Sequence, residues 1–333
     1  MPHYTIAVLD GALGAATALT LDALAAARRI AEALGKPALE WRVLSPAPAV
    51  RLGPGLTLSA DPLGPRTRLG RTTLIIPGLG FVEPAEIALR LAASDVELLA
   101  RLARRHHAQG GAVAASCSGV FLLGAGGLLA GRSATTAWWL ADAFRRLFPD
   151  SRLETGRMVV QDGRIATAGA ALAQMDLMLH LLRRDCGPKV ADLAARYLLI
   201  DGRPSQARYM VWSHLRHADE LVARLEGMAN RKIGDSFGVA EAARALRVTE
   251  RTLHRRVLKA TGRSPSAFLQ SIRLARAHHL LETTGLPVEE VARRIGYGDA
   301  TALRRLIRRN FQAAPRDLRR PVGQAAGPVG PIR

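Results

Sequence analysis

Short apolar runs alternate with longer amphipathic stretches over the first 200 residues of the chain. Apolar runs of about four to eight residues between turn residues are typical of buried strands, whereas apolar positions every three or four residues are typical of helices. A hairpin with an Asp162-Gly163 turn is also predicted. The alternation predicts a mainly parallel sheet covered by helices on both faces. The expected strands are residues 4–9, 39–45, 72–78 and 112–117, and the expected helices are 19–34, 95–110, 141–149, 172–187 and 189–201.

The alternation stops near Gly227, and short amphipathic helices separated by turn residues are predicted from there to Arg320. The final stretch, PVGQAAGPVGPIR, is rich in Pro and Gly and has no hydrophobic periodicity, which is typical of disorder. The chain is long enough for two domains with separate cores. We therefore expect an α/β domain over residues 1–200, a connector over 201–228, an all-helical domain over 229–321 and a disordered tail over 322–333.

The helical part contains a repeat. VAEAARALRVTERTLHRRVLKATGRSP, which begins at Val239, aligns with VEEVARRIGYGDATALRRLIRRNFQAAP, which begins at Val288. The spacing is 49 residues before the turn and 50 after it, because the second turn has one extra residue. Each unit combines a short helix, a tight turn and a second helix rich in Arg, with a small residue (Ala243 or Ala292) on the inner face of the first helix. Such a pattern predicts two helix-turn-helix units.

The second helix of each unit has an apolar inner side and a basic outer side. Leu253 and Val257 are predicted to face inward in the first unit, where Thr249 is the expected N-cap, and Leu303 and Ile307 in the second. A helix of this kind can lie in the DNA major groove, where Arg pairs with guanine. For each arginine, contact with a base and contact with a phosphate both remain open. The candidate DNA-binding residues are Arg251, Thr252, His254, Arg255, Thr301, Arg304, Arg305 and Arg308.

The charge of the chain supports a nucleic-acid partner for the helical part. The chain has a formal net charge of +19, and residues 227–333 hold 21 Lys and Arg against 8 Asp and Glu. The alternative is a solvated basic surface that reflects a general preference for Arg, but such a preference would act along the whole chain and does not explain the asymmetry. The two cysteines exclude a disulfide framework. We expect a cytoplasmic protein without a membrane segment, metal or cofactor.

The helical part resembles the AraC-type DNA-binding domain over about residues 230–320. The stretch V288-E-E-V-A-R-R-I-G-Y297, followed by Arg305, Phe311 and Pro315, matches the family pattern, as does the joining segment around Arg273-Leu274. The resemblance implies two helix-turn-helix units connected by a long helix. The chain departs from the pattern at Arg247, where a turn glycine is common, and at Gln312, where the family usually has Gly. These departures predict either strained turns or a shifted contact.

A possible nucleophile lies in the α/β part. In V113-A-A-S-C-S-G-V-F-L-L123, a strand is expected to turn sharply at Cys117 into a helix, as nucleophile elbows do. The helix dipole predicts a lowered pKa for the Cys117 thiol. Gly119 would let the helix approach the sheet closely. Strand ends of an open α/β sheet form the ligand crevice. The candidate pocket residues are Gly78, Leu79, Cys117, Ser118, Thr136 and Trp138.

This part resembles the DJ-1/PfpI group, which has a class I glutamine amidotransferase-like, flavodoxin-like fold, over about residues 4–185. The resemblance is carried by Pro77-Gly78, S116-C-S-G119, G126-G-L-L-A-G-R-S-A-T-T136 and T167-A-G-A-A-L-A-Q-M-D176, and it is closest to the GlxA-like regulators fused to AraC-type domains. Enzymes of the group place His or Glu where this chain has Ser118, Ala137 and Ala16. The resemblance therefore implies a non-catalytic domain.

Other histidines offer no obvious replacement. His106 and His107 lie on an amphipathic helix expected to be exposed, and His180 lies on a helix dominated by Leu and Met. Catalysis by cysteine requires a base or acid near the sulfur. Cys117 is therefore interpreted as a residue that lines a sensor pocket or packs structurally, with a cysteine-dependent amidohydrolase or glyoxalase-like enzyme as the alternative.

Together these features predict a sequence-specific transcriptional regulator of the AraC family. Expected partners are double-stranded promoter or operator DNA, a small-molecule effector, RNA polymerase and a second copy of the chain. The resemblance suggests small nitrogenous metabolites as effectors. A basic DNA binder without sequence preference is the second alternative.

Overall fold

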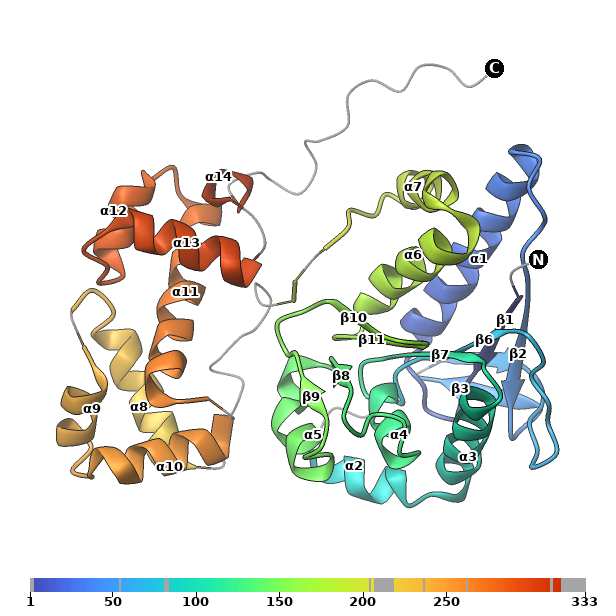
Figure 1. The fold of residues 1–333 in the computed structure, drawn as a ribbon, viewed down its shortest axis with the longest axis horizontal. Coiled ribbons are helices and arrows are strands. Elements are labelled where there is room, and N and C mark those ends of the chain that lie inside the picture. The colour runs from blue at the N-terminus through green and yellow to red at the C-terminus, as the bar shows by residue number, and fades with distance from the viewer. Residues whose placement is uncertain are drawn as a thin grey trace. The chain divides into compact units, whose positions relative to one another are not determined.

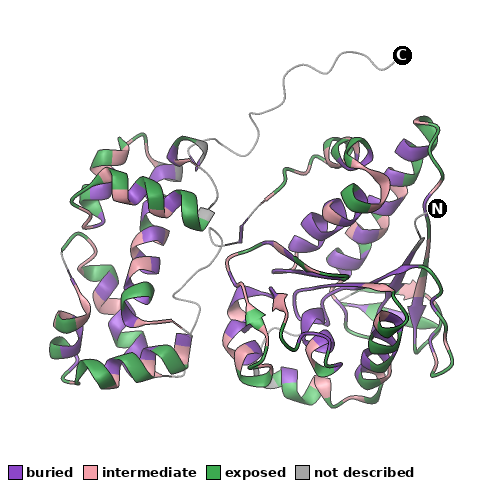
Figure 2. Ribbon diagram, viewed as in Figure 1, coloured by how far each residue is buried: buried purple, intermediate pink, exposed green. Residues whose placement is uncertain are grey.

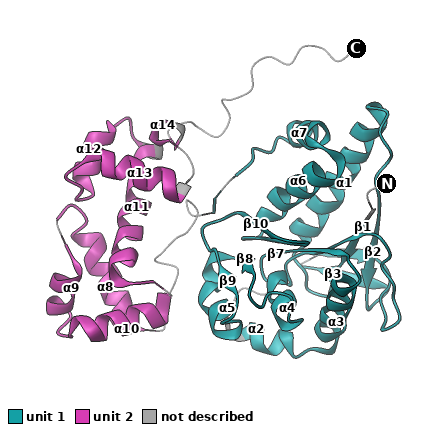
Figure 3. Ribbon diagram, in the orientation of Figure 1, with its two compact units in different colours: residues 1–206 teal, residues 207–333 magenta. Residues whose placement is uncertain are grey.

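The computed structural model describes residues 3–53, 55–80, 84–203, 205–206, 219–235, 237–261, 263–311 and 314–318. The chain divides into two compact units, Met1–Gln206 and Ala207–Arg333 (Figure 3). The tail predicted over 322–333 and the departure at Gln312 lie outside the described residues.

The first unit contains a seven-stranded sheet in the order β10-β11-β7-β6-β1-β2-β5 (Figure 1). All neighbouring strands are parallel except β10 and β11, which form the hairpin predicted at Asp162-Gly163. This order confirms the predicted flavodoxin-like fold and puts a reversal of strand order at β1, beside the carboxyl end of β6. The strands are β1 (His3–Ala7), β2 (Glu40–Ser45), β5 (Asp61–Pro62), β6 (Thr73–Ile76), β7 (Ala112–Ser116), β10 (Val159–Asp162) and β11 (Ile165–Ala168).

Helices cover both faces of this sheet because its strands are apolar on both sides (Figure 2). Along β6, Ile75 packs into one core while Leu74 and Ile76 pack into the other. On the Ile75 face lie α1 (Gly14–Ala33), α6 (Ala173–Cys186) and α7 (Pro188–Tyr197). On the other face lie α2 (Pro84–Leu91), α3 (Ser94–Ala108), α4 (Gly119–Ala125) and α5 (Ala141–Leu147). Like α2 and β5, several further short elements are not predicted by the periodicity: β3 (Ala49–Leu52), β4 (Leu56–Ser59), β8 (Ser133–Ala134), β9 (Arg152–Leu153) and the 3₁₀-helix η1 (Trp138–Leu140).

The second unit is helical and has two small cores that share one long helix. The first half of that helix packs Phe268 against Leu225 and Phe237, and the second half packs Leu281 against the following helices. The two predicted helix-turn-helix units are present, with the long helix between them. The helices are α8 (Glu220–Arg231), α9 (Val239–Ala245), α10 (Glu250–Thr261), α11 (Pro265–Thr283), α12 (Val288–Arg294), α13 (Ala300–Phe311) and α14 (Pro315–Leu318).

The predicted connector overlaps both units. Its expected end at residue 228 falls inside α8, because Leu221, Val222 and Leu225 belong to the core of the second unit. Its expected start falls before Ser205 and Gln206, which belong to the first unit. An amphipathic helix needs an apolar partner, and α8 finds it on α10 and α11.

Candidate functional site

Helices α10 and α13 share one pattern of buried and exposed positions, 50 residues apart, over residues 251–259 and 301–309. Leu253 and Val257 in α10, and Leu303 and Ile307 in α13, are fully buried as the sequence predicts. Thr252 is half-buried on the side of α10. The other candidate DNA-binding residues are exposed on the outer faces of the two helices: Arg251, His254, Arg255, Thr301, Arg304, Arg305 and Arg308.

Different side chains cap the N-termini of α10 and α13. Thr249 Oγ1 accepts a hydrogen bond from the Thr252 backbone N–H at 3.2 Å, as expected of an N-cap. Asp299 takes this role before α13 and accepts from the backbone N–H groups of Thr301 at 2.7 Å and Ala302 at 3.3 Å. These caps fix the direction in which each basic face points.

The turns before these helices also differ. Arg247 has a φ of 56°, which confirms the strain predicted at this position, since residues with a Cβ rarely adopt left-handed backbone. Gly296 occupies the corresponding position in the second unit with a φ of 77°. A Cβ at Gly296 would lie 2.8 Å from the carbonyl oxygen of Asp235. The second turn therefore requires glycine.

Some arginines of the second unit are held by acidic side chains. Arg304 of α13 forms an ion pair with Glu289 of α12, and Arg256 of α10 donates to Asp219 at 2.7 Å. Of the candidate DNA-binding arginines, four make no side-chain hydrogen bond or ion pair with any described residue. Their guanidinium groups are available to a phosphate or a base. These are Arg251, Arg255, Arg305 and Arg308.

The elbow in the first unit has the geometry of a nucleophile elbow. Cys117 lies between β7 and α4 with a φ of 53°, a conformation that is strained for any residue other than glycine. A Cβ at Gly119 would lie 2.5 Å from the carbonyl oxygen of Pro77, so glycine is what lets α4 approach β6, as the sequence predicts. Ser118 Oγ accepts from the Leu79 N–H at 2.8 Å, and Thr136 Oγ1 donates to the Cys117 carbonyl at 2.7 Å.

The elbow is closed. All six candidate pocket residues are buried, and Trp138 packs edge-on against Trp139 with ring centroids 5.3 Å apart. Burial raises the pKa of the Cys117 thiol, and the hydrogen bonds from Ser118 only partly oppose this shift. The expectation of a lowered pKa was therefore wrong, because loss of water from the thiolate outweighs the field of a seven-residue helix.

The histidines lie at the opposite edge of the sheet from Cys117. His106 is buried, and its Nε2 lies 2.9 Å from the carbonyl oxygen of Thr72, just before β6. The expectation that His106 is exposed was wrong, because Gly111 has no Cβ and leaves room for its ring. His180 Nε2 lies 2.6 Å from Gln161 Oε1 of β10, at the same amino edge. Ala16 and Ala137, which stand in place of the missing Glu and His, are buried.

A buried glutamine that the sequence does not reveal is bonded to the segments beside this elbow. The Gln206 side chain is 1% exposed; its Nε2 donates to the carbonyl oxygens of Thr136 at 2.9 Å and Thr155 at 2.8 Å. Its Oε1 accepts from the Ala170 N–H at 3.1 Å. Thr136 is the residue whose hydroxyl bonds the Cys117 carbonyl. Gln206 is thus hydrogen-bonded to the loop after β8, which in turn bonds the elbow.

Arg203 and Ser205, which precede Gln206, are also bonded to the first unit. Arg203 pairs with the buried Asp176 at 2.6 Å, and Ser205 Oγ donates to the Gly156 carbonyl at 2.6 Å. We call Arg203, Ser205 and Gln206 the Gln206 latch. The composition of this stretch, rich in turn residues, resembles a free connector, and nothing in its spacing indicates carbonyl partners far away in the sequence.

Comparison with known proteins assigns both units. The chain matches a helix-turn-helix domain model over residues 242–321 and the DJ-1/PfpI family over residues 72–184. It is 28% identical over 300 residues to the HTH-type transcriptional regulator CdhR of Pseudomonas aeruginosa, covering 86% of this chain and 83% of that protein. The chain is an AraC-family transcriptional regulator with a DJ-1/PfpI domain. This family was the one predicted.

Further comparisons agree with that family. The regulator GbdR of Pseudomonas aeruginosa is 28% identical over 225 residues, which are 65% of this chain and 60% of GbdR. The crystal structure of an AraC family transcriptional regulator from Pseudomonas putida has a TM-score of 0.50 at 21% identity, over 60% of this chain and all of that chain, and shares the fold. These relatives favour regulation over the enzyme alternative. Among the described residues, no helix is long and apolar enough to cross a membrane.

Proposed function

We propose that this regulator binds double-stranded DNA in a sequence-specific manner with the outer faces of α10 and α13. The observation that carries the proposal is the repeated exposed face, which presents four arginines without partners among the described residues. Each helix would enter a major-groove segment, the two segments being about one helical turn, or ~34 Å, apart. Phosphate contacts would supply affinity that depends strongly on salt.

The test starts from a duplex selected from a random library and measures affinity by fluorescence anisotropy at fixed salt. Arg255→Ala and Arg305→Ala should each weaken binding roughly tenfold or more on the selected duplex and less on an unrelated one. Arg276→Ala is the matched control, because Arg276 is exposed on α11 rather than on α10 or α13. Equal losses on both duplexes would instead support the alternative of a binder without sequence preference.

For the first unit we propose a non-catalytic sensor in which an effector binds beside Cys117. The candidate pocket is formed by Gly78, Leu79, Cys117, Ser118, Thr136 and Trp138, and access to it would require Gln206 to leave Thr136. Binding would then favour a state in which the chain after Gln206 is released. The support is the direct link from Cys117 through Thr136 to the last described residue of this unit.

Thiol labelling tests the closed elbow. Cys117 should react slowly with a thiol reagent in the native protein, since its thiol is buried and its pKa is raised. Gln206→Ala should accelerate labelling, with Cys117→Ser identifying the signal of Cys186. Turnover of methylglyoxal or glutamine that disappears in Cys117→Ser would overturn the non-catalytic proposal.

The remaining partners belong to the same proposal. We propose a cytoplasmic homodimer that contacts operator DNA and RNA polymerase; the support is the match to AraC-type transcriptional regulators. Sedimentation of the full chain with and without the selected duplex measures the oligomeric state.

A further inference from the structure

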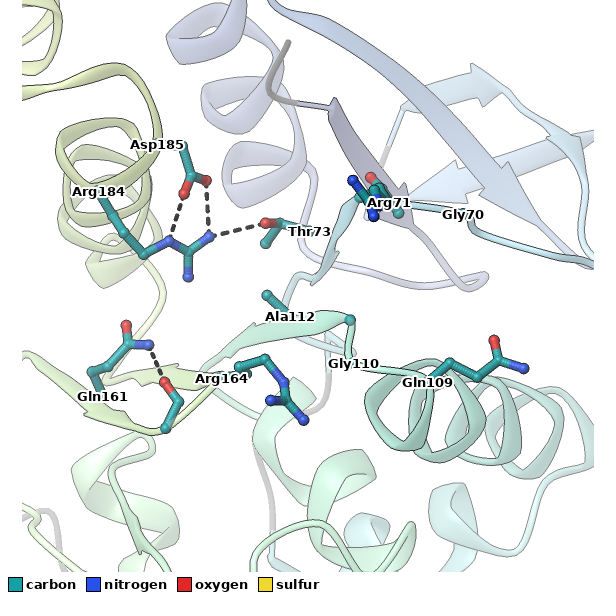
Figure 4. Close-up of a pocket in the computed structure, with 13 residues that line it drawn as sticks. Gly70, Arg71, Thr73, Gln109, Gly110, Ala112, Gln161, Arg164, Arg184 and Asp185 are labelled. Carbon is teal, nitrogen blue, oxygen red and sulfur yellow. Dashed lines mark hydrogen bonds and ion pairs between the residues drawn. The ribbon is translucent and has the colours of Figure 1, made fainter.

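An open polar cavity lies at the amino edge of the sheet of the first unit, at the opposite end from Cys117. Its volume is about 930 Å³, and it is lined by the residues before β6 and β7, by the β10–β11 turn and by the end of α6 (Figure 4). Cavities of roughly 300–1,000 Å³ are typical of small-molecule sites. Size alone does not indicate what it binds, whereas its charge does.

Three arginines from different segments converge on this cavity. Figure 4 shows Arg71, Arg164 and Arg184 around Ala112, the first residue of β7. Asp185 is the one acidic side chain among the lining residues. Its oxygens accept from Arg184 Nε at 2.6 Å and from the Tyr4 hydroxyl at 2.9 Å. The acid therefore holds one arginine in place and leaves an excess positive charge in the cavity.

The other two arginines have no such partner. Neither Arg71 nor Arg164 makes a side-chain hydrogen bond or ion pair with any described residue, and both are exposed. Arg184, by contrast, also donates to Thr73 Oγ1 at 2.9 Å. A neighbouring cavity of about 640 Å³ shares Arg71 and adds Arg42 and Arg68. The lining of this second cavity also includes the acidic Glu40.

Small residues provide the room between these guanidinium groups. Gly110 and Gly163 have φ values of 90° and 60°, and Gly111 would clash with the buried His106 ring if it carried a Cβ. Together with Ala112 they leave backbone rather than side chains at the bottom of the cavity. The space in front of the arginines is therefore kept open by residues that the local backbone requires to be small.

We propose that this cavity binds a small molecule carrying a carboxylate or a phosphate, with Arg71 and Arg164 as its principal ligands and Arg184 as a fixed neighbour. Guanidinium groups pair with both kinds of oxyanion in bidentate fashion. The site is separate from the elbow pocket, since it lies at the other edge of the sheet, and it requires no movement of the Gln206 latch. A general preference for arginine does not explain why three arginines line one cavity whose single acidic residue, Asp185, is already paired with one of them.

The test measures thermal unfolding of the full chain with citrate, inorganic phosphate or pyrophosphate, against potassium chloride of equal ionic strength. At least one of these anions should raise the melting temperature beyond the chloride control. The double variant Arg71→Gln/Arg164→Gln should weaken that anion's apparent affinity about tenfold or more. Citrate acting alone would identify carboxylate recognition, and phosphate or pyrophosphate acting alone would identify phosphate recognition.

Two controls separate this site from the rest of a basic protein. Arg29→Gln removes an exposed arginine of α1, and Arg255→Gln/Arg305→Gln removes the proposed DNA contacts; both should retain the anion effect. No stabilisation beyond chloride, or equal loss in Arg29→Gln, would overturn the proposal. So would a loss of DNA affinity in Arg71→Gln/Arg164→Gln as large as that in Arg255→Gln/Arg305→Gln, because the cavity would then be a nucleic-acid contact.

Discussion

The two helix-turn-helix units bury the same positions and differ in the residues around them. The first unit turns at Arg247 in left-handed backbone, whereas the second uses Gly296. The first ties its outer helix to α8 through Arg256 and Asp219, where the second has the half-buried Leu306. The arrangement of the helices therefore depends on the shared apolar positions, and the turns, caps and ion pairs are adjusted separately in each unit.

The same contrast extends to the basic faces. Arg304 in the second unit is paired with Glu289, whereas the corresponding positions of the first unit are His254 and Ala240. An arginine held by an acid must exchange that partner for DNA, and its net contribution is reduced accordingly. We expect the first unit to bind with fewer competing interactions.

The largest effect is expected at the second turn. Gly296→Ala should destabilise the second unit by about 2–3 kcal/mol, because the new Cβ would lie 2.8 Å from a backbone oxygen and the φ of 77° is unfavourable. Chemical denaturation of the full chain, followed by the helical signal, measures it. Gly298→Ala is the control, since a Cβ there has no neighbour within 4 Å. Equal losses in both variants would contradict the close contact.

The next largest effect is expected at Asp219, whose ion pair with Arg256 has no counterpart in the second unit. Asp219→Ala should cost about 1 kcal/mol, because its carboxylate caps α8 through the N–H groups of Leu221 and Val222. Asp219→Asn keeps a capping oxygen and loses the ion pair with Arg256, so it should lose less. If both variants were equally unstable, the ion pair rather than the cap would dominate.

Much of this architecture was predictable because it follows from local periodicity. The register of the two units came from apolar positions that recur with the helical period, and burial of Leu253 and Leu303 obeys that period. The central strands β1, β2, β6 and β7 were predictable from short apolar runs bounded by turn residues. The hairpin turn at Gly163, with a φ of 60°, follows from the preference of Asp-Gly for such turns.

What could not be predicted depends on residues distant in sequence. The pKa of the Cys117 thiol depends on its burial more than on the dipole of its own helix, and that burial is produced by residues of the whole core. The Gln206 side chain bonds to carbonyl groups 51 and 70 residues away, which no spacing rule indicates. The amino-edge cavity likewise combines Arg71 and Arg164 from segments that only the sheet brings together.

A smaller, stabilising effect is expected at the first turn. Arg247→Gly should raise the free energy of unfolding by about 0.5–1 kcal/mol, since glycine adopts the φ of 56° without strain but gains freedom in the unfolded chain. Arg247→Ala keeps a Cβ and should leave stability nearly unchanged. Equal stabilisation by Ala and Gly would mean that the charge of Arg247, rather than its backbone, is unfavourable.

The smallest effect is expected on DNA affinity, when an acidic residue is removed beside the basic face of α13 or added beside that of α10. Glu289→Gln should strengthen binding to the selected duplex about threefold, because it releases Arg304 and removes an acid near the phosphates. Ala240→Glu places an acid at the matching position of the first unit and should weaken binding by a similar factor. Both variants keep the buried faces of α9 and α12, so the free energy of unfolding should change by no more than about 1 kcal/mol, the contribution of an exposed ion pair. If Glu289→Gln weakened binding instead, Glu289 would be positioning Arg304 for DNA rather than competing with it.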